Sequence, residues 1–97
     1  MLTVQLTVSF QQWLDALRDM RGRIAIARRL DRVAAGNLGD AKSVGEGVSE
    51  LRVDVGPGYR VYFVKRGASV IVVLAGGDKS SQDRDIKAAQ KLAKEIR

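Results

Sequence analysis

Two β-strands and the turn between them are encoded in one stretch of the chain, residues 50–65, with the sequence ELRVDVGPGYRVYFVK. Charged and apolar residues alternate from Glu50 to Val55, which is the period of a strand with one buried face. Residues 56–58 (GPG) interrupt the alternation, and glycine next to proline is typical of a turn. Because a second strand is predicted from Tyr59 to Lys65, the stretch predicts a β-hairpin.

The chain after this hairpin predicts one more strand and a helix. Residues 66–68 (RGA) form a second hairpin turn, and the run that follows, Ser69–Ala75, is almost entirely apolar. A strand without a polar face is typically central in its sheet and covered on both sides. Residues 76–81 (GGDKSS) predict a break, and a serine within it can cap a last helix that runs through Ile96.

The residues before the hairpin predict a strand followed by a helix. Polar and apolar residues alternate over Leu2–Val8, the pattern of a half-buried strand. Ser9 and Gln12 have the spacing of a capping box. Apolar residues then recur at helical intervals: Phe10, Trp13, Leu14, Leu17 and Met20. Gly22 interrupts this pattern, so we expect the first helix to end before it.

A second amphipathic helix is predicted from about Arg23 to Ala35, and Gly36 has the place of a left-handed cap. Residues 37–47 predict a loop with a short strand around 41–44. The order is then β-α-α-β-β-β-α, a single α+β domain over residues 1–97 in which helices pack on an antiparallel sheet. Ninety-seven residues are enough for one such core and too few for two.

The composition excludes several kinds of site. The chain has no cysteine and no histidine, which removes disulfides, thiolate nucleophiles, structural zinc and the usual general base near neutral pH. No phosphate-loop motif is present, and we expect neither a cofactor nor a metal. Seventeen Lys and Arg against eleven Asp and Glu leave a net charge of +6, which favours an anionic partner. With no membrane-spanning run and no signal peptide at its start, we expect a cytoplasmic protein.

The two hairpins predict where charged side chains meet. If the first turn is a three-residue loop, Asp54 lies opposite Arg60 and Arg52 lies opposite Tyr62. If the second has two residues, Arg60 lies opposite Ala75, and the end of the last strand comes beside it. One face of the sheet then carries a polar patch of three basic residues, two carboxylates and a tyrosine: Arg52, Asp54, Arg60, Tyr62, Asp78 and Lys79. Two simpler interpretations stay open, an ordinary Arg60–Asp54 salt bridge and a core position for Tyr62.

Two further basic sets lie on predicted helices. One face of the second helix carries three arginines: Arg21, Arg28 and Arg32. They form either a solvated stripe or a track for phosphates, and the sequence leaves both open. The last helix carries three lysines opposite its buried stripe: Lys87, Lys91 and Lys94. We predict that these three form a solvated face.

Several motifs make the chain resemble a known group of proteins. The blocks that carry this resemblance are GNLGD (36–40), VGEGV (44–48), ELR (50–52), GPGYRVYF (56–63) and GGDKS (76–80). With this set the chain resembles the RelE/ParE toxin superfamily, specifically its HigB-like branch, also called addiction module killer proteins. The resemblance covers the whole chain, and the superfamily has the element order predicted above.

The resemblance implies the toxin of a type II toxin–antitoxin pair. Most toxins of the superfamily cut messenger RNA on the ribosome, whereas the ParE-like minority poison DNA gyrase. It also implies a neutralising antitoxin partner, which we expect to be of helix-turn-helix type and to form an oligomer with the toxin. Three functions therefore stay open: a ribosome-dependent, metal-independent endoribonuclease, a gyrase inhibitor, and a non-toxic basic module that binds antitoxin or nucleic acid.

Metal-free RNA cleavage needs a base for the 2′-hydroxyl, cations for the phosphoryl oxygens and an acid for the leaving 5′-oxygen. By position in the motifs, Arg52 and Arg60 match phosphate-holding residues, Lys79 matches a functional position after the last strand, and Lys42 is a candidate base. Further candidate substrate contacts are Tyr62, Asp78, Arg28 and Arg32. Several relatives have His or Tyr after the last strand, and this chain has neither from Gly76 to Arg97. Three alternatives follow: Lys79 and Asp78 transfer the protons, the site acts mainly by positioning on the ribosome, or the target is not RNA.

Overall fold

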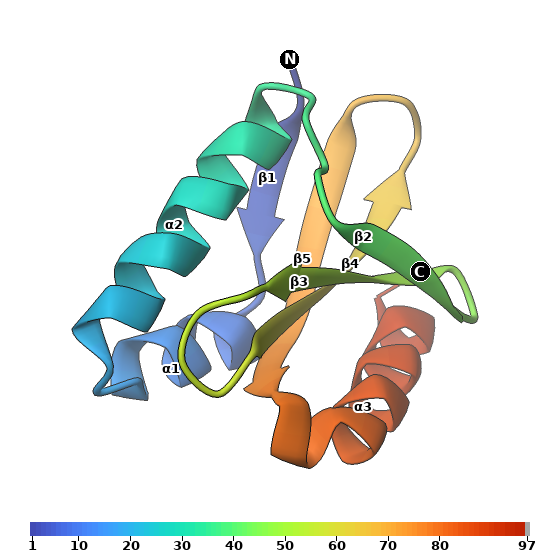
Figure 1. The fold of residues 1–97 in the computed structure, drawn as a ribbon. Coiled ribbons are helices and arrows are strands. Elements are labelled where there is room, and N and C mark those ends of the chain that lie inside the picture. Colours follow the sequence, from blue (N-terminus) through green and yellow to red (C-terminus); the bar gives the residue numbers. More distant parts are fainter. Residues whose placement is uncertain (97) are drawn as a thin grey trace.

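The computed structural model describes residues 1–96. Its strands are β1 (Thr3–Leu6), β2 (Ala41–Gly45), β3 (Val48–Val53), β4 (Tyr59–Arg66) and β5 (Val70–Asp78). Its helices are α1 (Val8–Ala16), α2 (Met20–Ala34), the short 3₁₀ helix η1 (Lys79–Ser81) and α3 (Gln82–Glu95). All five strands belong to one sheet, in the order β1-β5-β4-β3-β2 (Figure 1).

The predicted α+β class and element order are confirmed, and the short strand expected around 41–44 is present as the edge strand β2. The pairs β2–β3, β3–β4 and β4–β5 are antiparallel as predicted. The sheet is antiparallel except at β1, which pairs with β5 in parallel. A parallel neighbour needs a long connection rather than a hairpin, and β1 and β5 are separated by most of the chain.

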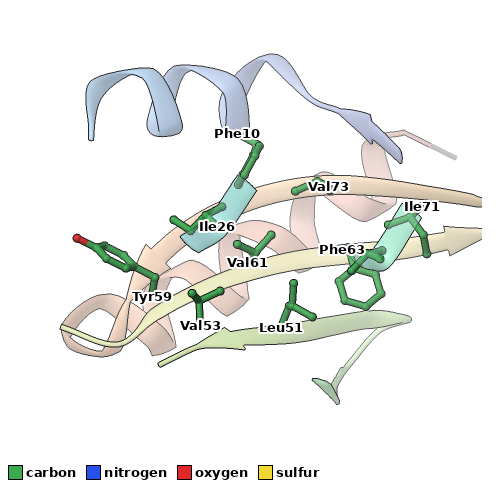
Figure 2. Packing of buried hydrophobic residues seen from close by; sticks show 10 residues of the cluster. Phe10, Ile26, Leu51, Val53, Tyr59, Val61, Phe63, Ile71 and Val73 are labelled. Atoms are coloured by element: carbon green, nitrogen blue, oxygen red, sulfur yellow. The ribbon is translucent and has the colours of Figure 1, made fainter. Parts of the chain in front are cut away.

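Helices cover both faces of the sheet, with α1 and α2 on one face and α3 on the other (Figure 1). On the first face, Phe10 of α1 and Ile26 of α2 pack toward strand residues such as Val61 (Figure 2). The central strand β5 contributes to both cores, because Val73 belongs to the first cluster and Leu74 to the second. This alternation explains its lack of a polar face, as predicted.

The helix starts differ from the prediction. The N-cap of α1 is Thr7, whose hydroxyl accepts a 3.1 Å hydrogen bond from the amide of Phe10, so the predicted capping box at Ser9 is wrong. Thr7 also donates to the carbonyl of Leu74, which ties the start of α1 to β5. Helix α2 begins at Met20 with Asp19 as its cap, and Gly22 lies inside its first turn rather than in a break.

The end of α2 agrees with the prediction, whereas β5 ends later than predicted. Gly36 has a φ of +95° after α2, which confirms the predicted left-handed cap. The break predicted at residues 76–81 begins later, because β5 continues through Asp78 and only then turns into η1. Within residues 1–96, no helix has the length and apolar character needed to cross a membrane.

Candidate functional site

The first hairpin has a longer loop than predicted. Val53 pairs with Tyr59 and Arg52 with Arg60, so residues 54–58 form a five-residue connection. Gly56 and Gly58 both have positive φ values, a conformation that favours glycine, and the amide of Gly58 donates to the carbonyl of Val55 within the loop. The predicted pairs of Asp54 with Arg60 and Arg52 with Tyr62 are therefore wrong by two residues. A shift of two keeps every strand side chain on its predicted face.

The pairing register of the second hairpin, between β4 and β5, also differs from the prediction. The predicted two-residue turn is wrong, because Arg66 pairs with Val70 and residues 67–69 form a three-residue loop. A bulge between Tyr62 and Phe63 shifts the register by one more residue, so Arg60 pairs with Gly77 rather than with Ala75. The displacement extends β5 along β4, so that Asp78 lies opposite Tyr59. Lys79 follows directly in η1 and still arrives beside Arg60, as the sequence predicted.

An open cleft lies where these strand ends meet. It has a volume of about 280 Å³ and is lined by Asp40, Arg52, Val53, Asp54, Gly58, Tyr59, Arg60 and Lys79. It brings together four members of the predicted patch, namely Arg52, Asp54, Arg60 and Lys79. These four come from β3, the following loop, β4 and η1, so the fold gathers residues that are far apart in the chain.

Arg60 forms the floor of the cleft and is only 8% exposed. Its Nη1 donates a 3.0 Å hydrogen bond to the carbonyl of Gly58, and its Nε lies 3.7 Å from Oε2 of Glu50. The predicted interpretation of a salt bridge to Asp54 is wrong, because the partner is the fully buried Glu50. Sequence reasoning missed Glu50, although its alternation with Arg52 already placed both on one face.

Arg52 forms the rim. Its side chain is 47% exposed, and its Nε donates to Oδ2 of Asp40 at 3.3 Å. Arg29 supports the strand from α2 by donating to the carbonyls of Arg52 and Leu38. Because solvent-exposed ion pairs contribute only about 0–1 kcal/mol, Arg52 can exchange Asp40 for a bound anion at little cost.

Lys79 forms the opposite rim, and its neighbour Asp78 does not line the cleft. Lys79 is exposed and has no ion-pair partner within residues 1–96. The carboxylate of Asp78 caps η1 by accepting hydrogen bonds from the amide and the hydroxyl of Ser80. The Ser80 hydroxyl is the main reason that the pKa of Asp78 lies below its ordinary value, and the nearby Arg60 charge acts in the same direction. Asp78 is thus a charged capping residue beside the cleft.

Two other candidates lie away from the cleft surface. Tyr62 has no exposed surface and belongs to the core under α3, where burial raises the pKa of its hydroxyl. We therefore leave it out of the proposed site. Lys42 is exposed on β2 and pairs in register with Glu50. It lies on the same face of the sheet as Glu50, one row from Arg52, but it does not line the cleft.

Arg28 and Arg32 extend the basic surface. Both are exposed on α2, and with Ala25 and Arg29 they line a shallow groove of about 250 Å³ beside residues 53–55. This groove shares Val53 and Asp54 with the cleft, so one continuous surface leads from Lys79 across Arg52 to these arginines. On α3, Lys87 and Lys91 are exposed, and Lys94 pairs with the exposed Glu46.

The residues of the cleft suit the binding of an anion. Its one tyrosine, Tyr59, does not act as an acid near neutral pH. Three cations and two carboxylates, Asp40 and Asp54, line the cleft itself, and Asp78 lies next to it outside the lining. Burial and a hydrogen bond to Asp19 raise the pKa of Tyr59 to about 12, so this hydroxyl stays protonated and engaged. Residues 1–96 contain no cluster of three or more carboxylates that could hold a metal ion.

Two comparisons with known proteins each cover most of the chain. A profile of the family described as "Phage derived protein Gp49-like (DUF891)" matches residues 12–96. A protein of Haemophilus influenzae, named "Uncharacterized protein", is 45% identical over 97 residues, which cover 98% of each chain. Both similarities include every residue of the cleft.

Proposed function

We propose that this chain, which belongs to the Gp49-like (DUF891) family of phage-derived proteins, is the toxin of a type II toxin–antitoxin pair and cleaves messenger RNA on the ribosome. The Gp49-like family is related to the RelE/HigB toxins. The observation that carries the proposal is the cleft in which Arg52, Arg60 and Lys79 meet. Guanidinium groups suit this task because their planar forks match the oxygens of a phosphate.

The reaction is the attack of a 2′-hydroxyl on the adjacent phosphorus. The 2′-oxygen forms a bond to phosphorus, the bond to the 5′-oxygen breaks, and the products carry a 2′,3′-cyclic phosphate and a 5′-hydroxyl. Arg60 and Arg52 hold the non-bridging oxygens, on which negative charge increases in the transition state. Lys79 donates a proton to the leaving 5′-oxygen. The proposed base for the 2′-hydroxyl is Lys42, which lies outside the cleft on the same face of the sheet, so the bound RNA must extend over the edge strand β2 to meet it.

The groove on α2 gives the RNA a path beyond the scissile phosphate. Arg28 and Arg32 are exposed there and have no ion-pair partner within residues 1–96. A single-stranded message bound at the cleft would place its neighbouring phosphates along this groove. Of the two interpretations of the α2 stripe, this favours the phosphate track for Arg28 and Arg32.

The proposal is tested by brief induction in cells, followed by mapping of the 5′ ends of translated messages. Wild-type protein should arrest growth and produce new 5′ ends, and Arg52→Ala or Lys79→Ala should reduce both. Lys91→Ala is a matched control, because Lys91 is an exposed cation on α3 outside the cleft. Absence of new 5′ ends with the wild-type protein would count decisively against cleavage.

A second candidate function is inhibition of DNA gyrase. It is favoured by one observation, the absence of any His in the chain and of any Tyr from residue 76 onward, which leaves the usual proton donors of the nucleases without a counterpart. Induction would then give DNA damage while messages stay intact. A protein that does neither and causes no growth arrest would be a binding module only.

The partner is proposed to be an antitoxin encoded beside this chain, with a helix-turn-helix domain. Co-expression of the neighbouring reading frame should restore growth, and the two proteins should co-purify as one oligomeric complex. A neighbouring protein that neither binds nor neutralises this chain would exclude that partner.

A further inference from the structure

A carboxylate lies directly under the cleft with none of its surface exposed. Glu50 is 0% exposed and points to the α3 face of the sheet, in the row next to that of Arg52 and Arg60. The same face of the sheet carries an apolar cluster that includes Val48 and Leu74. Glu50 and Arg60 are the two buried charged residues of the described chain, and Glu50 is the more deeply buried of the two.

The two oxygens of Glu50 have different surroundings. Oε2 accepts a 2.8 Å hydrogen bond from the amide of Gln82 and lies 3.7 Å from Nε of Arg60. Within residues 1–96, Oε1 has no hydrogen-bond partner, and neither has the buried hydroxyl of Tyr62 or Nε of Arg60. The carboxylate is therefore held on one side only.

Such a residue is a poor choice for stability alone. Burial of a carboxylate costs free energy, and a buried ion pair is often no more stabilising than apolar residues of similar volume. An apolar residue at position 50 would match the surrounding core. What only a carboxylate provides here is its contact with Arg60 and Gln82.

We propose that Glu50 is the positioning residue of the cleft, which fixes the guanidinium of Arg60 toward the bound phosphate. The guanidinium is restrained at two points: Nε forms an ion pair with Glu50 at 3.7 Å, without a hydrogen bond, and Nη1 donates to the Gly58 carbonyl. Gln82 is the first residue of α3, directly after η1, so the same carboxylate also ties the segment that carries Lys79. A cation fixed before the reaction stabilises a transition state without reorganisation.

The orientation of Arg60 can be tested without any assumption about function. In ¹⁵N-labelled protein, the Nε–Hε signal of Arg60, assigned by its loss in Arg60→Lys, should exchange with water at least ten times more slowly than the exposed arginines. Glu50→Gln should abolish this protection. Glu46→Gln should keep it, because it removes the same charge from an exposed pair at the far hairpin. Undiminished protection in Glu50→Gln would overturn the proposal.

The role in the reaction rests on the proposed function and is tested with ribosomes translating a defined message. Glu50→Gln should lower kcat at least tenfold, while the KM for ribosomes stays the same or falls, because one negative charge is lost under a site for anions. A raised KM with unchanged kcat would overturn the positioning role. If wild-type protein does not cleave at all, the proposed function fails, and the exchange measurement still decides whether Glu50 orients Arg60.

Gln82→Ala provides a second variant if Glu50→Gln does not fold. It removes the hydrogen bond to Oε2 from the start of α3 and leaves both charges in place. We expect a partial loss of Arg60 protection, about threefold, and a matching loss of kcat. Full protection together with full kcat in this variant would contradict the arrangement proposed here.

Discussion

Gly22 of α2 packs against the ring of Tyr59 on β4 so closely that a Cβ atom on Gly22 would lie 2.9 Å from Cζ of that ring. The same Cβ would lie 3.0 Å from Oδ2 of Asp19, which accepts a 2.7 Å hydrogen bond from the Tyr59 hydroxyl. The glycine thus lets the first turn of α2 approach the sheet at the strand that carries Arg60. This contact connects the start of α2, through Tyr59, to the strand that carries the floor of the cleft.

Gly22→Ala should destabilise the protein, although alanine is normally about 1 kcal/mol better than glycine in a helix. The added methyl group meets the Tyr59 ring, and overpacking of this kind costs about 1–3 kcal/mol. Chemical unfolding of both proteins measures the difference. In a Tyr59→Leu background, which lacks the outer ring atoms, the same substitution should cost less. Equal costs in the two backgrounds would show that the ring is not the obstacle.

Tyr59→Phe should lower stability most between about pH 4 and pH 10. The Tyr59 hydroxyl is the main cause that holds the pKa of Asp19 below its ordinary value of 3.8, so its stabilisation is present above that pH and is lost as the pH falls. Burial, followed by Asp19, raises the pKa of Tyr59 from 10.0 to about 12, so the wild type loses stability as the pH rises through that range. Thermal unfolding of both proteins from pH 2.5 to 11.5 checks this. A difference independent of pH would contradict it.

The strands and helices could be predicted because their periodicities are local. The errors lie at positions whose local structure depends on a contact formed only in the folded chain. Gly22 ends the apolar pattern in the sequence, but Tyr59 makes a glycine necessary inside the helix. Gly76 and Gly77 resemble a loop, yet they continue β5 because each is crowded from one face of the sheet. Tyr59 and Trp13 are far in the sequence from Gly22 and Gly76, so no local pattern contains both partners of those contacts. Asp85 is close to Gly77 in the sequence, but the two meet only because η1 turns the chain between them.

The substitutions Gly76→Ala and Gly77→Ala should both destabilise the protein, for different reasons. A Cβ on Gly76 would lie 2.8 Å from Cδ2 of Trp13, which is packed under Tyr59, and a Cβ on Gly77 would lie 2.7 Å from Cγ of Asp85. Overpacking predicts a loss of about 1–3 kcal/mol in each case. Asp85→Ala should relieve Gly77→Ala and leave the cost of Gly76→Ala unchanged. A double-mutant cycle measures both, and no relief at Gly77 would be the contrary result.

The site was also predicted in part: the meeting of its basic residues was expected, but some of their contacts were not. Arg52, Arg60 and Lys79 meet as the hairpins implied, because a register error of two residues does not change the face of a strand. The partner of Arg60 was missed, since that depends on which residue lies beside it, and the five-residue loop moves Asp54 out of the strand pair. Tyr62 keeps its face and still has no access to the cleft, because α3 covers it.

Asp40→Asn should strengthen the binding of single-stranded RNA. Asp40 competes for Arg52 through an exposed ion pair, and such pairs are worth about 0–1 kcal/mol, or at most about a fivefold change in affinity. Fluorescence anisotropy with a labelled RNA oligomer at low salt measures the effect. Asp83→Asn is the matched control, because Asp83 is exposed in the first turn of α3 and does not line the cleft. Weaker binding by Asp40→Asn would mean that Asp40 itself supports the RNA.

The salt dependence of RNA binding should locate the basic charge that acts at the interface. Each phosphate that a cation neutralises on a single strand steepens the slope of log K against log salt by about 0.7, because counterions are released. Arg52→Ala should therefore make the slope shallower by about 0.7, since Arg52 is half exposed at the rim and free to meet a phosphate. Lys91→Ala should leave it unchanged, as Lys91 lies on the α3 surface outside the cleft. Titrations of the three proteins between 50 and 300 mM salt, on the order of the range over which such binding collapses, measure the slopes. Equal slopes for wild type and Arg52→Ala would place the RNA elsewhere on the molecule, and a loss confined to Lys91→Ala would place it on α3.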